Sequence, residues 1–210
     1  LAPTVDNVSI TDAEGDQTLG IYGFVNAGDN VSVTATFSEA VIFDNASITP
    51  TITLAVGSDN RTATYASGDN STDLVFRYTI VAEDTDSNGI SIRANALDNN
   101  SSTIRDRAGN IATDITHSAV PDNSSYIVDN TPPTISSVAI DNATNKQNNF
   151  LNAGDNVTIK VTFSEAPISA VIIDNASAAT LTLVVGSENR TAVYDSGDST
   201  IVSSGSDNAS

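Results

Sequence analysis

The residues of this chain with the clearest chemical potential are carboxylates and amides at alternate positions in one short segment. Residues 82–89 read AEDTDSNG, so Asp84, Asp86 and Asn88 follow the pattern D-x-D-x-N-G. Alternating oxygen ligands followed by a glycine that permits a sharp turn are typical of the first half of a calcium-binding loop. The glutamate that completes an EF-hand loop is absent, because Asn95 stands at that position. An acidic hairpin turn is the alternative interpretation.

The overall charge also favours a hard cation. Eight Lys and Arg against 26 Asp and Glu give a formal net charge of -18 over 210 residues. This charge would repel a nucleic-acid backbone and an anionic membrane surface, so we expect neither as a partner. No apolar run approaches the roughly 18 residues that a membrane span needs, so we expect no direct membrane insertion. The surplus of carboxylates favours Ca²⁺ as a cofactor and an extracellular, ion-rich location at the cell surface.

Most kinds of enzymatic site are disfavoured by composition. The chain has no Cys, which excludes disulfides, thiolate zinc sites and cysteine nucleophiles, and its one histidine is His117. That histidine lies in a polar loop without a nucleophile motif around it. We therefore expect no catalytic residue and no enzymatic activity, and we expect that replacing His117 by Ala changes stability little.

The apolar residues alternate with period two, as half-buried strands require. Examples are Ile52, Leu54 and Val56, and the run that begins at Leu74 and Phe76. Seven strands are predicted in the first part of the chain, near residues 5–10, 30–37, 48–56, 61–66, 73–81, 89–97 and 124–128. No stretch has helical periodicity, so the predicted class is all-β, as tandem immunoglobulin-like β-sandwiches.

Several sequence blocks occur twice in the same order. The repeated blocks are NAGDN at Asn26 and Asn152, FSEA at Phe37 and Phe163, DNAS at Asp44 and Asp174, and VGSDNRTATYASGD at Val56, which matches VGSENRTAVYDSGD at Val185. Small insertions separate the blocks, which indicates a duplicated domain. The second copy begins near Asp129 to Pro133, so we expect an Ig-like domain over 1–130 and a second one over 131–210.

The second copy is predicted to be incomplete. After SGDST it lacks counterparts of the strands at 73–81, 89–97 and 124–128. Such a fragment would leave an apolar face and strand edges open and should not be stable alone. Either the natural chain is longer than this sequence, or strands from a neighbouring subunit fill the gap in a donor-strand arrangement.

The motif order VDNTPPTI, AGDNVTIKVTFSEA, TLTLVVGSENRTAVYDSGD and IRDRAGN resembles the bacterial Ig-like tandem repeats of large cell-surface adhesins. Similar repeats occur in archaeal surface-layer proteins. The resemblance implies that the domains act as extenders that hold a ligand-binding tip away from the cell. It also implies that calcium at domain junctions stiffens the array, and that the partners are neighbouring Ig-like domains of the same or adjacent chains.

Antiparallel alternation of the predicted strands places the loops at 11–30, 57–60 and 82–89 at one end of the first domain, with the exit at Asp129. The carboxylates expected there are Asp12, Glu14, Asp16, Asp29, Asp84, Asp86 and Asp129, facing a second domain whose loops include Glu165. A cation would relieve their mutual repulsion. The predicted calcium ligands are therefore Asp29, Asp84, Asp86, Asn88, Asp129 and Glu165. Asp106 and Glu39 fall at the opposite end, as half of a second site or as a capped turn.

Three functional hypotheses remain. The first is a non-enzymatic stalk or extender of an adhesin, with calcium fixing the angle between neighbouring domains. The second is a subunit of a surface layer or filament completed by strand exchange. The third is a glycan- or protein-binding module that uses loops such as 98–120, although an aromatic content of 5% disfavours a platform for stacking sugars.

Overall fold

The computed structural model describes residues 1–14, 24–43, 48–164 and 179–195. Their regular elements are all β-strands, so the chain is all-β as predicted. The chain divides into two compact units, Leu1–Asn130 and Thr131–Ser210, which we call unit 1 and unit 2. Among the described residues there is no helix with the length and hydropathy to cross a membrane. Two residues of the predicted acidic cluster, Asp16 and Glu165, lie outside the described residues.

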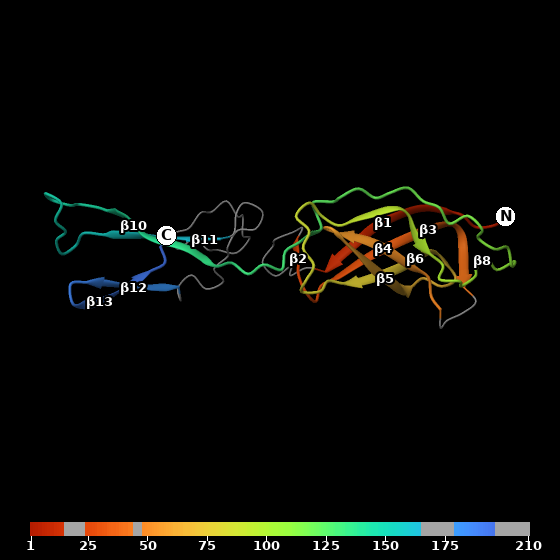
Figure 1. The fold of residues 1–210 in the computed structure, drawn as a ribbon, viewed down its shortest axis with the longest axis horizontal. Coiled ribbons are helices and arrows are strands. Elements are labelled where there is room, and N and C mark those ends of the chain that lie inside the picture. The colour runs from red at the N-terminus through yellow and green to blue at the C-terminus, as the bar shows by residue number, and fades with distance from the viewer. Residues whose placement is uncertain (15–23, 44–47, 165–178, 196–210) are drawn as a thin grey trace. The chain divides into compact units, whose positions relative to one another are not determined.

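Unit 1 contains nine described strands, which are drawn in Figure 1. They are β1 (Val5–Glu14), β2 (Phe24–Val25), β3 (Asn30–Phe43), β4 (Thr51–Val56), β5 (Asp59–Ser67), β6 (Ser71–Thr79), β7 (Ser91–Asp98), β8 (Ile104–Arg105) and β9 (Ile127–Val128). Six of them form one hydrogen-bonded path in the order β1-β3-β6-β5-β4-β7, and β8 joins it by pairing with β3. Strand β6 therefore connects the β1–β3 pair to the β5–β4–β7 group.

One hydrophobic core lies against all the longer strands of unit 1. Val31, Val33 and Ala35 of β3 are completely buried, and so are Leu74 and Phe76 of β6. The core cluster also takes residues from β1, β4, β5, β7 and β8. Because every second residue of a strand points to the same face, the alternating apolar pattern of the sequence is what places these side chains inward. The predicted alternation is confirmed in β3, β4 and β6.

Several features of unit 1 were not predicted, among them the extension of β1 to Glu14 and the short strand β8. Strand β3 does not end at Phe37 but continues to Phe43 after a break in its pairing with β6, and its last residues pair with β8. The final strand, predicted over 124–128, is only the two residues of β9, and it pairs parallel with β2 inside a segment predicted to be a loop. Short strands are hard to predict, because two residues carry no periodicity.

His117 holds a bulge in β7. Leu54 of β4 pairs with Ile92 of β7, and Ile52 of β4 pairs with Leu97. The β7 segment between its two paired residues is therefore longer than the β4 segment opposite it. The ring Nε2 of His117 accepts hydrogen bonds from the backbone N–H groups of Ala96 (2.8 Å) and Leu97 (3.2 Å). The Nδ1 atom lies 2.8 Å from the carbonyl oxygen of Ser118, which identifies Nδ1 as the protonated nitrogen. His117 therefore has a structural role that the sequence did not reveal.

Unit 2 contains four described strands in two separate two-stranded sheets. Strand β10 (Ile135–Ala143) pairs with β11 (Val157–Phe163), and β12 (Thr180–Val185) pairs with β13 (Glu188–Val193), both antiparallel. Large apolar side chains of these strands are exposed, among them Ile140 (66%) and Val184 (66%). The described strands of unit 2 therefore do not enclose a core like that of unit 1.

The role of His117 in the β7 bulge leads to the first prediction. Replacing His117 by Ala removes the acceptor of two backbone N–H groups, which should lower the free energy of unfolding by about 1–3 kcal/mol. Replacing the neighbouring exposed Ser118 by Ala keeps its backbone carbonyl and should change stability by less than about 0.5 kcal/mol. Urea denaturation of both variants measures the difference, and equal stabilities would show that water replaces the imidazole without loss.

Candidate functional site

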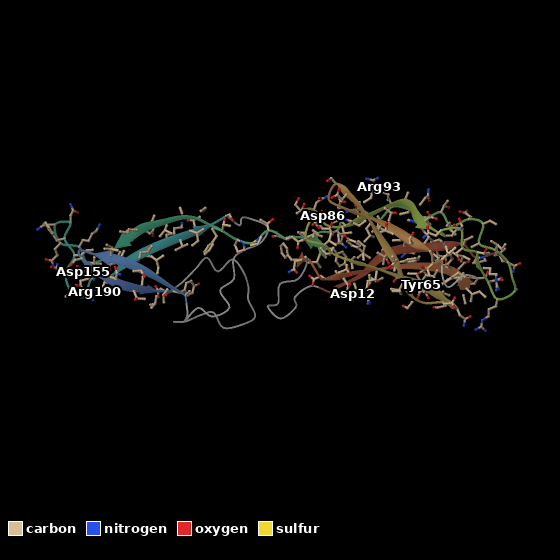
Figure 2. The ribbon with its side chains drawn as sticks, turned by 60° about the horizontal axis from the view of Figure 1, so that its bottom comes forward. Asp12, Tyr65, Asp86, Arg93, Asp155 and Arg190 are labelled. Atoms are coloured by element: carbon tan, nitrogen blue, oxygen red, sulfur yellow. The ribbon has the colours of Figure 1, made fainter. Side chains whose placement is uncertain are left out.

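Main-chain hydrogen bonds bring the predicted acidic loops to one end of unit 1. Asp29 accepts from the N–H of Ile80 (2.8 Å) through its carbonyl oxygen. Asp86 and Val128 exchange two hydrogen bonds of 2.9 Å, and the N–H of Asp129 donates to the carbonyl of Val25 (3.1 Å). We call this region the exit end, because the chain leaves unit 1 here. Figure 2 shows Asp12 and Asp86 toward this end.

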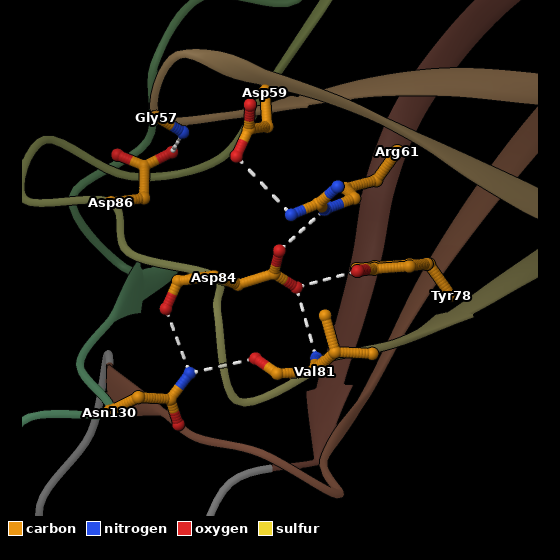
Figure 3. Close-up of polar contacts among 8 residues, drawn as sticks. All are labelled: Gly57, Asp59, Arg61, Tyr78, Val81, Asp84, Asp86 and Asn130. Carbon is orange, nitrogen blue, oxygen red and sulfur yellow. Dashed lines mark hydrogen bonds and ion pairs between the residues drawn. The ribbon is translucent and has the colours of Figure 1, made fainter.

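A buried carboxylate, Asp84, forms the centre of the exit end (Figure 3). The side chain of Asp84 has no exposed surface. Its Oδ1 atom accepts from Nε of Arg61 (2.5 Å), and its Oδ2 atom accepts from the hydroxyl of Tyr78 (2.6 Å) and the N–H of Val81 (3.0 Å). Arg61 also contacts Asp59 at 3.3 Å. Donors from β5, from β6 and from the turn that follows β6 thus all contact the carboxylate of Asp84.

This environment keeps Asp84 ionised. Burial by itself would raise the pKa of the Asp84 carboxyl, but the hydrogen bonds from Tyr78, Val81 and Arg61 outweigh burial and hold that pKa below its ordinary value of 3.8. Burial, and next the hydrogen bond to Asp84, raise the pKa of the Tyr78 phenol above its ordinary value of 10.0. The phenol therefore remains a hydrogen-bond donor over the whole physiological pH range.

Asp86 organises the adjacent turn. Its Oδ2 atom accepts from the N–H of Gly57 (2.7 Å), and its Oδ1 atom accepts from the N–H groups of Asn88 (3.2 Å) and Gly89 (2.8 Å). Gly89 has φ 99°, and a Cβ at this position would overlap the carbonyl of Asn123. The motif D-x-D-x-N-G thus forms a tight turn in which both aspartates accept hydrogen bonds from the protein itself.

Asn130 fastens the exit of unit 1 to this turn. Its Nδ2 donates to the carbonyls of Val81 (3.0 Å) and Asp84 (2.8 Å), and its Oδ1 accepts from the N–H of Ala27 (2.6 Å). We refer to these three hydrogen bonds as the Asn130 latch. Sequence reasoning missed both the latch and Arg61, although the recurrence of Arg61 as Arg190 in the second copy was a signal for the arginine.

The structure thus places the predicted calcium ligands of unit 1 at one end, but it does not converge them on a common point. The Oδ2 atom of Asp29 accepts from the N–H of Asn26 (2.8 Å), and the Nδ2 atom of Asn88 donates to Asp122. Among the described residues no three His, Cys, Asp or Glu side chains are grouped so that they could hold a metal ion. The carboxylate of Asp84 already binds the guanidinium of Arg61. A metal cation at this end would therefore have to bind carboxylates nearer the surface. Calcium binding remains a prediction.

The second candidate position, Asp106, forms a capped turn. Its carboxylate accepts from the N–H (2.8 Å) and the Nδ2 atom (2.7 Å) of Asn110, and the residue is 4% exposed. The side-chain bond from Asn110, followed by backbone bonds from Asn110, Ala108 and Gly109, lowers the pKa of Asp106 against the opposing effect of burial. This geometry corresponds to the capped-turn alternative.

The Asp84 network leads to the second prediction. Replacing Asp84 by Asn leaves Arg61 and the buried donors without a carboxylate, which should lower the free energy of unfolding at pH 7 by about 3 kcal/mol. Because the folded-state pKa lies below 3.8, the carboxylate stabilises the fold at all pH values above about 4. Its contribution is lost as the pH falls from there through the folded-state pKa.

The measurement is urea denaturation of wild type and variant between pH 2 and pH 7. The difference between them should shrink below about pH 4. Asp73→Asn, on the exposed face of β6, is the matched control and should change stability by less than about 0.5 kcal/mol. A difference that stays constant across the pH range would contradict the role of the Asp84 charge.

Comparison with known proteins gave no further assignment. No protein-family model matches the chain, and neither a curated protein nor a solved structure matches it.

Proposed function

We propose that the chain is a non-enzymatic structural module of an extracellular surface protein, in which tandem Ig-like β-sandwiches serve as a stalk or extender. The observation that carries the proposal is the path of the chain through unit 1. The chain enters unit 1 beside Ser38, in the second half of β3, where Thr4 and Ser38 exchange hydrogen bonds of 2.9 and 3.1 Å. It leaves near the Asn30 end of β3, where the Asn130 latch holds it.

Entry and exit at opposite ends suit a domain that transmits tension. Between Asn30 and Phe37, β3 spans about 23 Å at 3.3 Å per residue. A pull on the two ends of unit 1 acts along β1, whose antiparallel pairing with β3 runs from Val5↔Phe37 to Glu14↔Asn30. The hydrogen bonds of this ladder are then loaded together in shear rather than one after another. Domains joined in this way would extend a chain while each keeps its fold.

The repeated sequence supports the tandem part of the proposal. A stalk gains length by repeating one unit, and the blocks at Asn26 and Val56 recur at Asn152 and Val185. The charge of -18 suits an extracellular protein that must stay soluble.

The third prediction concerns mechanical strength. When the chain is stretched between its ends, unit 1 should unfold in one discrete force event and lengthen by about 430 Å, since 130 residues extended at about 3.5 Å each reach about 455 Å and the folded unit already spans about 23 Å along β3. Asn130→Ala removes the latch and should lower both the unfolding force and the free energy of unfolding, the latter by about 1–3 kcal/mol.

Single-molecule force spectroscopy measures both quantities. Asn7→Ala, at an exposed position of β1, is the matched control and should leave the unfolding force unchanged. Gradual lengthening of wild type at low force, with no discrete event, would contradict a role in transmitting tension.

The fourth prediction concerns calcium, which enters the proposal as the cation that neutralises the carboxylates of the exit end and stiffens the junction. Binding to the folded form alone raises the unfolding temperature by mass action. Millimolar Ca²⁺ should therefore raise the melting temperature by several degrees relative to chelator. It should also narrow the range of molecular dimensions measured by solution scattering. Asp29→Asn should weaken the effect. Identical melting and scattering curves with and without Ca²⁺ would remove calcium from the proposal and leave the stalk function standing.

A further inference from the structure

The strand pairings of unit 2 repeat those of unit 1 with constant offsets. The pair Val5↔Phe37 corresponds to Ile135↔Phe163, with offsets of 135 - 5 = 130 and 163 - 37 = 126. All seven β10–β11 pairs follow these offsets, and both register breaks recur at the corresponding residues. The six β12–β13 pairs follow the β4–β5 pairs with an offset of 180 - 51 = 129. Corresponding residues of the two units can therefore be compared directly.

In unit 1, β6 lies between the two strand pairs that unit 2 shares. It pairs antiparallel with β3, from Asn30↔Thr79 to Thr36↔Asp73, and with β5 through Tyr65↔Phe76 and its neighbours. The resulting order β1-β3-β6-β5-β4 joins the two pairs into one sheet. In the described part of unit 2 the corresponding pairs remain two separate sheets, β10–β11 and β12–β13.

Residues that correspond to the core of unit 1 are exposed in unit 2. Val8 is 5% exposed, whereas its counterpart Val138 is 49% exposed. Val56 is 1% exposed, whereas its counterpart Val185 is 55% exposed. Exposed apolar surface beside strand edges is the kind of surface to which a further strand adds.

We propose that unit 2 binds one additional extended strand with the pattern of β6, in the order β10-β11-strand-β13-β12. The bound strand runs antiparallel to β11 and β13, and main-chain hydrogen bonds to the two edges supply affinity. Apolar residues at the positions of Leu74 and Phe76 point inward, as those residues do in unit 1, where both are completely buried. The partner is therefore an extended β-strand with the apolar pattern of β6. The proposed stalk function does not require it, because unit 1 alone shows the path of the chain.

Charge further specifies the partner strand. Lys160 of β11 corresponds to Thr34 of β3, which pairs with Val75 of β6. Lys160 is exposed, on the side of β11 away from its apolar residues. An acidic residue at the Val75 position of the bound strand would lie directly opposite this ammonium group, and such cross-strand pairs of opposite charge are stabilising. The preferred strand therefore differs from β6 at this one outward position.

The test uses the full chain and a synthetic peptide of residues 71–80, STDLVFRYTI. Saturating peptide should slow hydrogen exchange of the Val157–Phe163 amides by about tenfold or more, while exchange in β3 stays unchanged because β6 already pairs there. A peptide with Val75→Glu should bind about twofold to fivefold more tightly. Adding Lys160→Glu to the chain should reverse that preference.

The control peptide has the same composition but exchanges Leu74 with Val75 and Phe76 with Arg77. This exchange puts Arg at an inward position, so the control should not slow exchange in β11. Equal protection by both peptides would mean unspecific hydrophobic association, and no protection by either would mean that the edges do not accept a strand. Protection that rises with chain concentration and is not displaced by the peptide would assign the surface to a second copy. Each of these three results overturns the proposal.

Discussion

The pairing of β6 with both β3 and β5 is the constraint on which the structure of unit 1 depends. Within the described residues, this strand joins the N-terminal pair to the group that contains β4 and β7. Its inward residues Leu74 and Phe76 are completely buried in the core. The following inward residue, Tyr78, reaches the carboxylate of Asp84. One strand thus links the sheet, the core and the exit end, because alternate residues of a strand share a face along its whole length.

The exit end shows how two buried carboxylates of an acidic sequence are paired by donor groups of the protein itself. Asp84 is neutralised by Arg61, and Asp86 is satisfied by backbone N–H groups. Both are buried, and a buried carboxylate without partners would be costly. The hydrogen bonds fix the turn, and the Asn130 latch uses the carbonyl groups of the same turn to hold the outgoing chain. Electrostatics and chain path are therefore coupled at the point where a stalk domain would pass tension to its neighbour.

The two units show what the strands of unit 1 beyond the shared pairs contribute. Their shared pairs have corresponding registers, including the breaks after Ile10 and Ile140. The β10–β11 and β12–β13 pairs therefore have the registers of unit 1 without described counterparts of its other strands. Their apolar faces are not buried to the same extent, since Val138 is 49% exposed where its counterpart Val8 is 5% exposed. Hairpins form from neighbouring residues, whereas a core requires strands that are distant in the chain.

The sequence by itself determined the strand class and most long strands, because alternation of residues such as Ile52, Leu54 and Val56 carries the period of a half-buried strand. It also placed the loops of Asp29, Asp84 and Asp86 at one end, because antiparallel order dictates which loops meet. Only the tertiary structure decided the partners of those carboxylates, the acceptor role of His117 and the Asn130 latch. These depend on atoms brought together from distant strands at hydrogen-bond distances, and neither composition nor spacing encodes such distances.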